Sequence, residues 1–281
     1  MMINKQIKHY SYAELESLLK NKKQLIHTNQ YKNTKAHIDE CNFCWNLWNR
    51  VRWNKAMENN GTQELEEFFG ENFIPYFDSS WALANQWYKQ NPETEGAVKN
   101  FYKTTPYYIY NSFIFHKSGD RISKIDSLMK IIKKHKVQSV LDYGCGIGLD
   151  GLEMISLGLD VHFVDYDSPS IKFLKYKLKK DGAKKLINQV YDVEEIFKNP
   201  PKVDLIWSID VLEHMLDPMK IFEVFTDKTK IFIFYIDSAE QNGGRHPFHF
   251  EVDYQEIEKT LKKLGFKKEN HNTFQVWIKE N

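Results

Sequence analysis

The chain has 281 residues, of which 42% are hydrophobic and 15% aromatic, enough to build one large core or two ordinary ones and too apolar for wholesale disorder. Its net charge of +1 gives no general reason to expect a nucleic acid or an anionic membrane as partner. Three cysteines are too few for a disulfide framework, and neither a signal peptide nor a run of about 20 apolar residues that could span a membrane is present. We therefore expect a soluble cytoplasmic protein.

Residues 1–60 contain short helical patterns with polar breaks, and we predict a small helical domain there. Its motif "HIDECNFC" places His37, Cys41 and Cys44 at offsets of zero, four and seven, on one face of a helix. Imidazole nitrogens and thiolates are the usual ligands of structural zinc. The alternative is that both cysteines are small buried hydrophobic residues beside neighbouring tryptophans.

The pattern His-x3-Cys-x2-Cys resembles the zinc-binding anti-sigma domain, a small helical module that has a further Cys or His upstream. The resemblance implies His9, which lies 28 residues before His37, as the fourth ligand, and leaves His27 as the alternative. Such a closed set of ligands implies a structural zinc ion that stabilises a domain too small for a large core of its own. A protein partner of this domain stays open.

Residues 61–118 are rich in aromatic side chains, and we predict a helical lid or connector there. The stretch from Phe101 to Phe115 contains seven aromatic residues in fifteen. These side chains either line a ligand pocket or dock the segment onto the domain that follows it. The sequence does not decide between the two.

Residues 119–281 have a regular pattern that begins with an amphipathic helix at 121–135. Short apolar runs then alternate with helical patterns, at 137–144, 160–167, 185–193, 203–210 and 230–237. This alternation predicts β-α units on a largely parallel sheet, which is an α/β fold. A last helix and a closing hairpin are predicted near the end of the chain.

The most specific chemical motif is "VLDYGCGIGLDGL", at the end of the first predicted strand. Gly144, Gly146 and Gly148 follow Asp142 there, and glycine lets the backbone turn tightly and approach a ligand. Asp165 ends the second predicted strand, where its carboxylate can accept hydrogen bonds from both hydroxyls of a ribose. Because the Asp142 carboxylate would repel a phosphate but attract an ammonium group, we predict a nucleoside cofactor with an amino-acid part.

The motif "VLDYGCGIG" resembles, residue by residue, the first motif of class I S-adenosylmethionine-dependent methyltransferases. The resemblance covers residues 119–281 and implies a seven-stranded Rossmann-like sheet and S-adenosylmethionine as cofactor. It places Asp142 and the loop glycines at the methionine part, Asp165 at the ribose, and Tyr166 and Asp192 at the adenine. Ser208, in the fourth predicted strand, is also assigned to the cofactor site.

The segment "SIDVLEH" after the fourth strand resembles the small-molecule branch of this family, including the ubiquinone-biosynthesis O-methyltransferases. Asp210, Glu213 and His214 share one face if this turn is helical. His214 is then a candidate general base for an acceptor hydroxyl. The alternatives are a divalent metal site formed by the three residues and a purely structural role. Further along, His246 and His249 fall where the family contacts its acceptor, or they only pack.

We therefore predict a methyltransferase that acts on a small molecule, with oxygen favoured over nitrogen or carbon as the methylated atom. The alternative is a non-catalytic regulatory or scaffold protein that binds the cofactor and acts through its N-terminal zinc domain. Neither a nucleic acid nor a membrane is expected as a partner.

Overall fold

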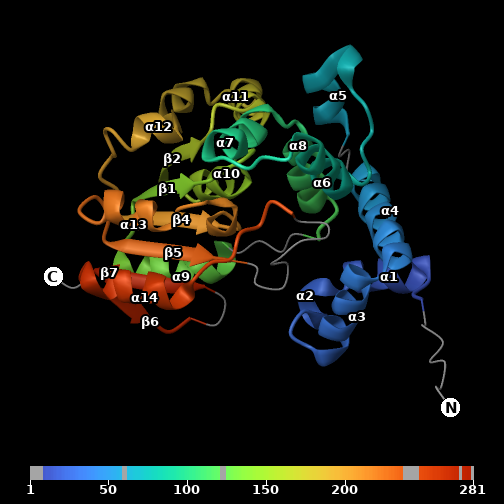
Figure 1. The fold of residues 1–281 in the computed structure, drawn as a ribbon, viewed down its shortest axis with the longest axis horizontal. Helices are drawn as coiled ribbons and strands as arrows, with labels where there is room; N and C mark the ends of the chain where they lie inside the picture. The colour runs from blue at the N-terminus through green and yellow to red at the C-terminus, as the bar shows by residue number, and fades with distance from the viewer. Residues whose placement is uncertain (1–8, 59–61, 121–124, 237–246, 272–273, 280–281) are drawn as a thin grey trace. The chain divides into compact units, whose positions relative to one another are not determined.

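The computed structural model describes residues 9–58, 62–120, 125–236, 247–271 and 274–279 (Figure 1). Contacts within the chain divide it into two compact units. The helical unit is Met1–Ser79 with Tyr110–Ile122, and the sheet unit is Ser80–Ile109 with Ser123–Asn281. The three domains predicted from the sequence, with boundaries at residues 60 and 118, stay a prediction.

The helical unit is built from several short helices and one longer helix, α4. They are α1 (Tyr12–Lys20), α2 (Lys22–Leu25), α3 (Asn29–Glu40), α4 (Asn42–Glu58), α5 (Gln63–Phe69), the 3₁₀ helix η1 (Gly70–Asn72) and most of α8 (Tyr107–Lys117). Helices α1 and α3 both contact α4. Leu15, Ile38 and Trp48, one from each of these helices, are fully buried. This burial of apolar side chains holds the three helices together.

A buried group of three charges joins distant segments of the helical unit. Asp120 is 1% exposed, and its carboxylate oxygens lie 2.5 Å from Lys22 Nζ and 3.1 Å from Arg52 Nη1. Burial raises the pKa of the Asp120 carboxyl, but the positive charges of Lys22 and Arg52 outweigh burial, so that the net shift of this pKa is downward. The group therefore ties α2 and α4 to the segment that follows α8.

The sheet unit contains seven strands and the remaining helices. The strands are β1 (Ser139–Tyr143), β2 (Asp160–Asp165), β3 (Val190–Asp192), β4 (Leu205–Ile209), β5 (Ile231–Tyr235), β6 (Phe266–Glu269) and β7 (Gln275–Lys279). The helices are α6 (Ser79–Gln90), α7 (Glu95–Thr104), α9 (Ile125–His135), α10 (Leu149–Ser156), α11 (Pro169–Lys180), η2 (Lys184–Gln189), α12 (Val193–Ile196), η3 (Leu212–His214), α13 (Met219–Phe225) and α14 (Tyr254–Lys263).

The strands form one sheet in the order β3-β2-β1-β4-β5-β7-β6 (Figure 1). Strands β1 to β5 pair in parallel, and β7 is antiparallel to both of its neighbours. Helices cover both faces. Val140 packs in one core with side chains of α9, α10 and α11, and Leu141 packs in the other with α12, α13 and α14. The predicted α/β fold with a seven-stranded Rossmann-like sheet is confirmed.

The order of the strands also locates the crevice where a ligand can bind. Strand β2 lies on one side of β1 and β4 on the other. The chain therefore adds strands outward from β1 through β2 to β3, and then returns to add β4 on the opposite side of β1. Ligands of such sheets bind at this switch point, outside the carboxyl ends of the strands. The loops that follow β1, β2 and β4 therefore border this crevice.

Candidate functional site

The loop between β1 and α10 contains three glycines with a left-handed backbone, at φ values of 74° for Gly144, 55° for Gly146 and 75° for Gly148. A Cβ atom on Gly144 would lie 2.4 Å from Val211 Cγ2, and one on Gly148 would lie 2.5 Å from Leu174 Cδ1. A Cβ atom on Gly146 would meet no atom within 4 Å. Packing inside the protein therefore requires the outer two glycines, and the middle glycine faces open space.

Asp142, at the base of this loop, is 4% exposed. Its Oδ2 accepts the backbone N–H of Gly151 at 3.1 Å, in the first turn of α10. The residue that precedes α10, Gly148, has no side chain that could cap the helix. Asp142 supplies this cap from the neighbouring strand and so fixes the start of the helix, a role that the sequence motif alone did not indicate.

Asp165, at the end of β2, reaches across to the glycine loop. Its Oδ2 accepts the N–H of Gly146 at 2.7 Å, and its Oδ1 accepts the N–H of Tyr166 at 2.7 Å. Burial raises the pKa of the Asp165 carboxyl to about 6, against the opposing effect of these two hydrogen bonds, and nearby Asp192 adds to the increase. Each carboxylate oxygen has a second lone pair, so this group can also accept ligand hydroxyls.

Asp192 and Tyr166 lie at the neighbouring strand ends. Asp192 Oδ1 accepts the N–H of Glu194 at 2.8 Å and caps α12, and its Oδ2 accepts the N–H of Asp167 at 3.0 Å. The Tyr166 ring lies parallel to that of Tyr102, with centroids 6.4 Å apart. Asp192 thus holds the loop after β2 in place, and the Tyr166 side chain places an aromatic ring in the same loop.

Ser208 lies on β4, on the far side of β1 from Asp165. It is 2% exposed, and its hydroxyl has no hydrogen-bond partner among the residues that the structure describes. Buried hydroxyls are nearly always paired. This one is therefore a candidate contact for a ligand at the switch point.

The turn after β4 is helical only in its later part. The 3₁₀ helix η3 begins only at Leu212, and Asp210 is exposed with a left-handed φ of 57°. Asp210 therefore does not share a helical face with Glu213 and His214. In the described parts of the chain, these three residues do not form a group that could hold a metal ion.

His214 is enclosed by aromatic rings from three segments. Its Nδ1 lies 3.2 Å from the hydroxyl oxygen of Tyr102 on α7. The Phe248 ring lies almost parallel to the imidazole at 5.7 Å, and the His249 ring meets it edge-on at 4.5 Å. Tyr108 approaches edge-on at 6.1 Å. Two tyrosines of the aromatic-rich segment thus belong to this site, although nothing in the sequence distinguished them from their neighbours. The other predicted acceptor histidine, His246, lies outside the described residues.

A second constellation lies in the helical unit. His9 Nδ1, His37 Nε2, Cys41 Sγ and Cys44 Sγ all lie within 4.8 Å of one another, and no other such group occurs in the residues for which the structure gives positions. Three nitrogen–sulfur distances are 3.4, 3.8 and 3.3 Å. Tetrahedral zinc, with bonds of about 2.0–2.3 Å, holds its ligand atoms roughly 3.3–3.8 Å apart. These three nitrogen–sulfur distances therefore fit zinc.

The fold explains how these ligands come together. His37 is in the last turn of α3, Cys41 ends that helix, and Cys44 is on the first turn of α4. His9 approaches from the segment before α1. The alternative fourth ligand, His27, is exposed and is not part of the group.

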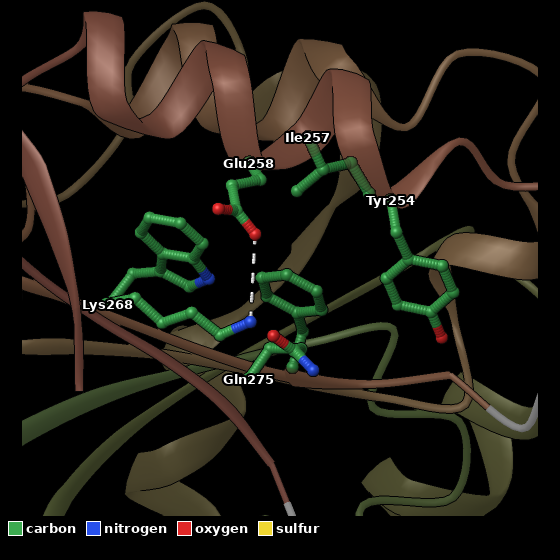
Figure 2. A pocket seen from close by; sticks show the side chains of 7 residues that line it. Tyr254, Ile257, Glu258, Lys268 and Gln275 are labelled. Atoms are coloured by element: carbon green, nitrogen blue, oxygen red, sulfur yellow. Dashed lines mark ion pairs between the residues drawn. The ribbon is translucent and has the colours of Figure 1, made fainter. Parts of the chain in front are cut away.

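A pocket of about 330 Å³ lies elsewhere in the sheet unit, between α14 and the strands at the β6 edge (Figure 2). Glu258 and Lys268 form an ion pair of 3.7 Å there. None of the residues predicted to bind a cofactor or an acceptor lines this pocket. It is therefore not part of the candidate site.

Comparison with known families assigns the central part of the chain. Residues 141–230 match the family model described as a methyltransferase domain. This segment is therefore similar to methyltransferase domains. It contains the glycine loop, Asp165, Asp192 and the turn with His214, which are the features that the geometry brings to the switch point.

Two curated proteins are similar to about half of this chain. The ubiquinone biosynthesis O-methyltransferase of Pelagibacter ubique (strain HTCC1062) is 29% identical over 135 residues, which are 48% of this chain and 51% of that protein. The enzyme of the same name from Colwellia psychrerythraea is 22% identical over 148 residues, or 53% of this chain and 56% of that protein. The chain thus spans about half the length of the curated relatives that it matches.

The solved structures that are similar to this chain include a magnesium protoporphyrin IX methyltransferase from Synechocystis PCC 6803 with bound SAH. It is 13% identical, with a TM-score of 0.45, over 79% of this chain and 95% of that chain.

None of the described helices combines the length and the apolar character needed to cross a lipid bilayer.

Proposed function

We propose that this protein is an S-adenosylmethionine-dependent methyltransferase that methylates a hydroxyl oxygen of a small molecule. The observation that carries this proposal is the open space at Gly146, directly beside the carboxylate of Asp165 and at the switch point of the sheet. The match to a methyltransferase domain supports it. The two curated relatives, both named as O-methyltransferases, support the choice of oxygen.

The residues at the switch point fit this cofactor. Asp165 accepts the ribose hydroxyls, Tyr166 covers the adenine and Asp192 keeps the adenine side of the loop in place. Asp142 provides negative charge for the ammonium group, and Ser208 pairs its buried hydroxyl with a polar atom of the ligand. When bound, S-adenosylmethionine supplies a methyl group on a sulfonium sulfur, and its transfer to oxygen leaves the electron pair of the broken bond on sulfur.

The acceptor side is formed around His214. We assign to this imidazole the role of general base, which takes the proton of the acceptor hydroxyl as the oxygen becomes methylated. The surrounding rings exclude water and hold the acceptor close to the methyl group. Such positioning can contribute on the order of 7–11 kcal/mol to catalysis.

The helical unit has a structural task in this proposal. His9, His37, Cys41 and Cys44 bind one zinc ion, and with four protein ligands the site has no open position for catalysis. All three cysteines of the chain lie in the described residues and none is in a disulfide. Such thiols fit a reducing compartment, so we propose the cytoplasm as the location.

The direct test of the activity uses methyl-labelled S-adenosylmethionine and fractions of a metabolite extract. Label should enter a small-molecule fraction with the native protein and not with His214→Ala, which should still bind the cofactor. The second candidate function is a non-catalytic regulatory or scaffold protein that acts through the zinc-binding group of its helical unit. It would bind the cofactor and transfer no label to any fraction.

A further inference from the structure

The hydroxyl of Tyr102 lies between two groups of the sheet unit. Its oxygen is 3.2 Å from Nδ1 of His214 and 3.2 Å from the carbonyl oxygen of Phe248. A phenolic hydroxyl has one hydrogen to donate and can also accept. A carbonyl oxygen can only accept, whereas Nδ1 of an imidazole either donates or accepts, depending on its tautomer.

These properties favour one arrangement of the protons. If Tyr102 donates to Nδ1, the carbonyl of Phe248 faces a hydroxyl oxygen without any hydrogen between them. If Tyr102 donates to the carbonyl, Nδ1–H of His214 donates to Tyr102 and both contacts become hydrogen bonds. Because two oxygen atoms that face each other at 3.2 Å repel unless a hydrogen lies between them, the second arrangement is favoured.

We infer that Tyr102 is a positioning residue that holds His214 in the Nδ1–H tautomer, so that Nε2 is the basic nitrogen. The inference rests on the proposed function, in which His214 is the general base. It gives α7, which precedes the methyltransferase domain in the chain, a part in setting up the catalytic base. The tautomer of a catalytic histidine is commonly set by the hydrogen bond that its other nitrogen makes.

The surroundings of both side chains are consistent with this role. Burial raises the pKa of Tyr102 well above its ordinary value, so this side chain keeps its proton at neutral pH. The imidazole is held between the parallel ring of Phe248 and the edge-on ring of His249. The ring therefore cannot turn over without moving these neighbours.

The tautomer can be measured by long-range ¹H–¹⁵N spectra of the full chain labelled with ¹⁵N-histidine, in the presence of S-adenosylhomocysteine. His214 is assigned by the signals that disappear in His214→Gln. Native His214 should show a protonated Nδ1 and an unprotonated Nε2 at a pH where the ring is neutral. Tyr102→Phe removes only the hydroxyl and should shift His214 toward the Nε2–H form. A native ring protonated at Nε2 would overturn the inference without any variant.

A matched control exists in the same unit. Tyr191 has its hydroxyl oxygen 3.2 Å from Nδ1 of His162, and neither residue belongs to the proposed site. Tyr191→Phe should leave the signals of His214 unchanged. An unchanged His214 tautomer in folded Tyr102→Phe would overturn the inference.

The measurement needs no acceptor, so its outcome is separate from that of the proposed function. With an acceptor in hand, Tyr102→Phe should lower turnover about tenfold or more and leave the affinity for S-adenosylhomocysteine unchanged. A native Nδ1–H tautomer together with full turnover in His214→Ala would reject the base and leave the role of Tyr102 in fixing the tautomer intact.

Discussion

The carboxylate of Asp165 accepts the backbone N–H of Gly146 at 2.7 Å, which joins the last residue of β2 to the middle glycine of the loop after β1. The two residues are 19 positions apart in the chain. Parallel pairing of β1 with β2 brings both to the same edge of the sheet. The hydrogen bond therefore joins two separate sequence motifs, the glycine loop and the acidic residue that ends the second strand, into one site.

The raised pKa of Asp165 predicts that cofactor affinity depends on pH. The ionised carboxylate accepts ribose hydroxyls better than the protonated carboxyl does, and burial raises its pKa to about 6. Affinity for S-adenosylhomocysteine should be constant above pH 7 and fall by up to about tenfold per pH unit below 6. Titrations from pH 5 to 8 measure it. Asp165→Asn should bind weakly, without this dependence, and an equal pH dependence in both proteins would refute the assignment.

Gly146→Ala should separate folding from binding. Alanine at a left-handed position costs about 1–2 kcal/mol of stability, and the new Cβ enters the open space where the cofactor is proposed to lie. Gly182, with φ of 76° and equally open surroundings, is the matched control. Thermal melting should show a similar loss of stability in Gly146→Ala and Gly182→Ala. Only Gly146→Ala should lose affinity for S-adenosylhomocysteine, by tenfold or more, and unchanged affinity would mean that the loop does not contact the cofactor.

The cluster in the helical unit predicts about one zinc ion per chain. Elemental analysis of Cys41→Ser and Cys44→Ser should show loss of the metal, because each substitution removes a thiolate ligand. Cys145→Ser, which changes the remaining cysteine, should keep it. His9→Ala should lose zinc and His27→Ala should retain it. A metal-free native protein with an intact helical unit would mean that these residues only pack together.

Asp120→Asn should destabilise the helical unit. The substitution leaves Lys22 and Arg52 without their buried counter-charge, which costs about 3–5 kcal/mol. Because the pKa of Asp120 is lowered below its ordinary value of 3.8, its contribution is complete above that pH and is lost as the pH falls further.

Hydrogen exchange of peptides from the helical unit measures the effect of Asp120→Asn. Asp39→Asn serves as the control, because it removes a partly exposed carboxylate that pairs with Lys35 within α3. This control should cost no more than about 0.5 kcal/mol. Equal protection from exchange in the two variants would show that the buried charges contribute no more stability than the partly exposed ion pair.

The parts of this molecule that were predictable from the sequence depend on local patterns. The alternation of apolar runs and helices predicted the sheet, and the spacing of His37, Cys41 and Cys44 predicted their convergence. The contact of Tyr102 with His214 spans 112 residues, and a dense aromatic stretch contains no period that singles out one tyrosine. The φ of 57° at Asp210 could not be predicted, because a left-handed φ at a non-glycine residue has no signature in the sequence.

The most direct test of the account is calorimetric titration of the native protein and Asp165→Ala with S-adenosylhomocysteine at pH 7.5. We predict one binding site per native chain and a loss of a few kcal/mol of binding free energy in the variant, because buried hydroxyls of the ligand lose their acceptor. Absence of binding to the folded native protein would contradict the assignment of a functional methyltransferase site.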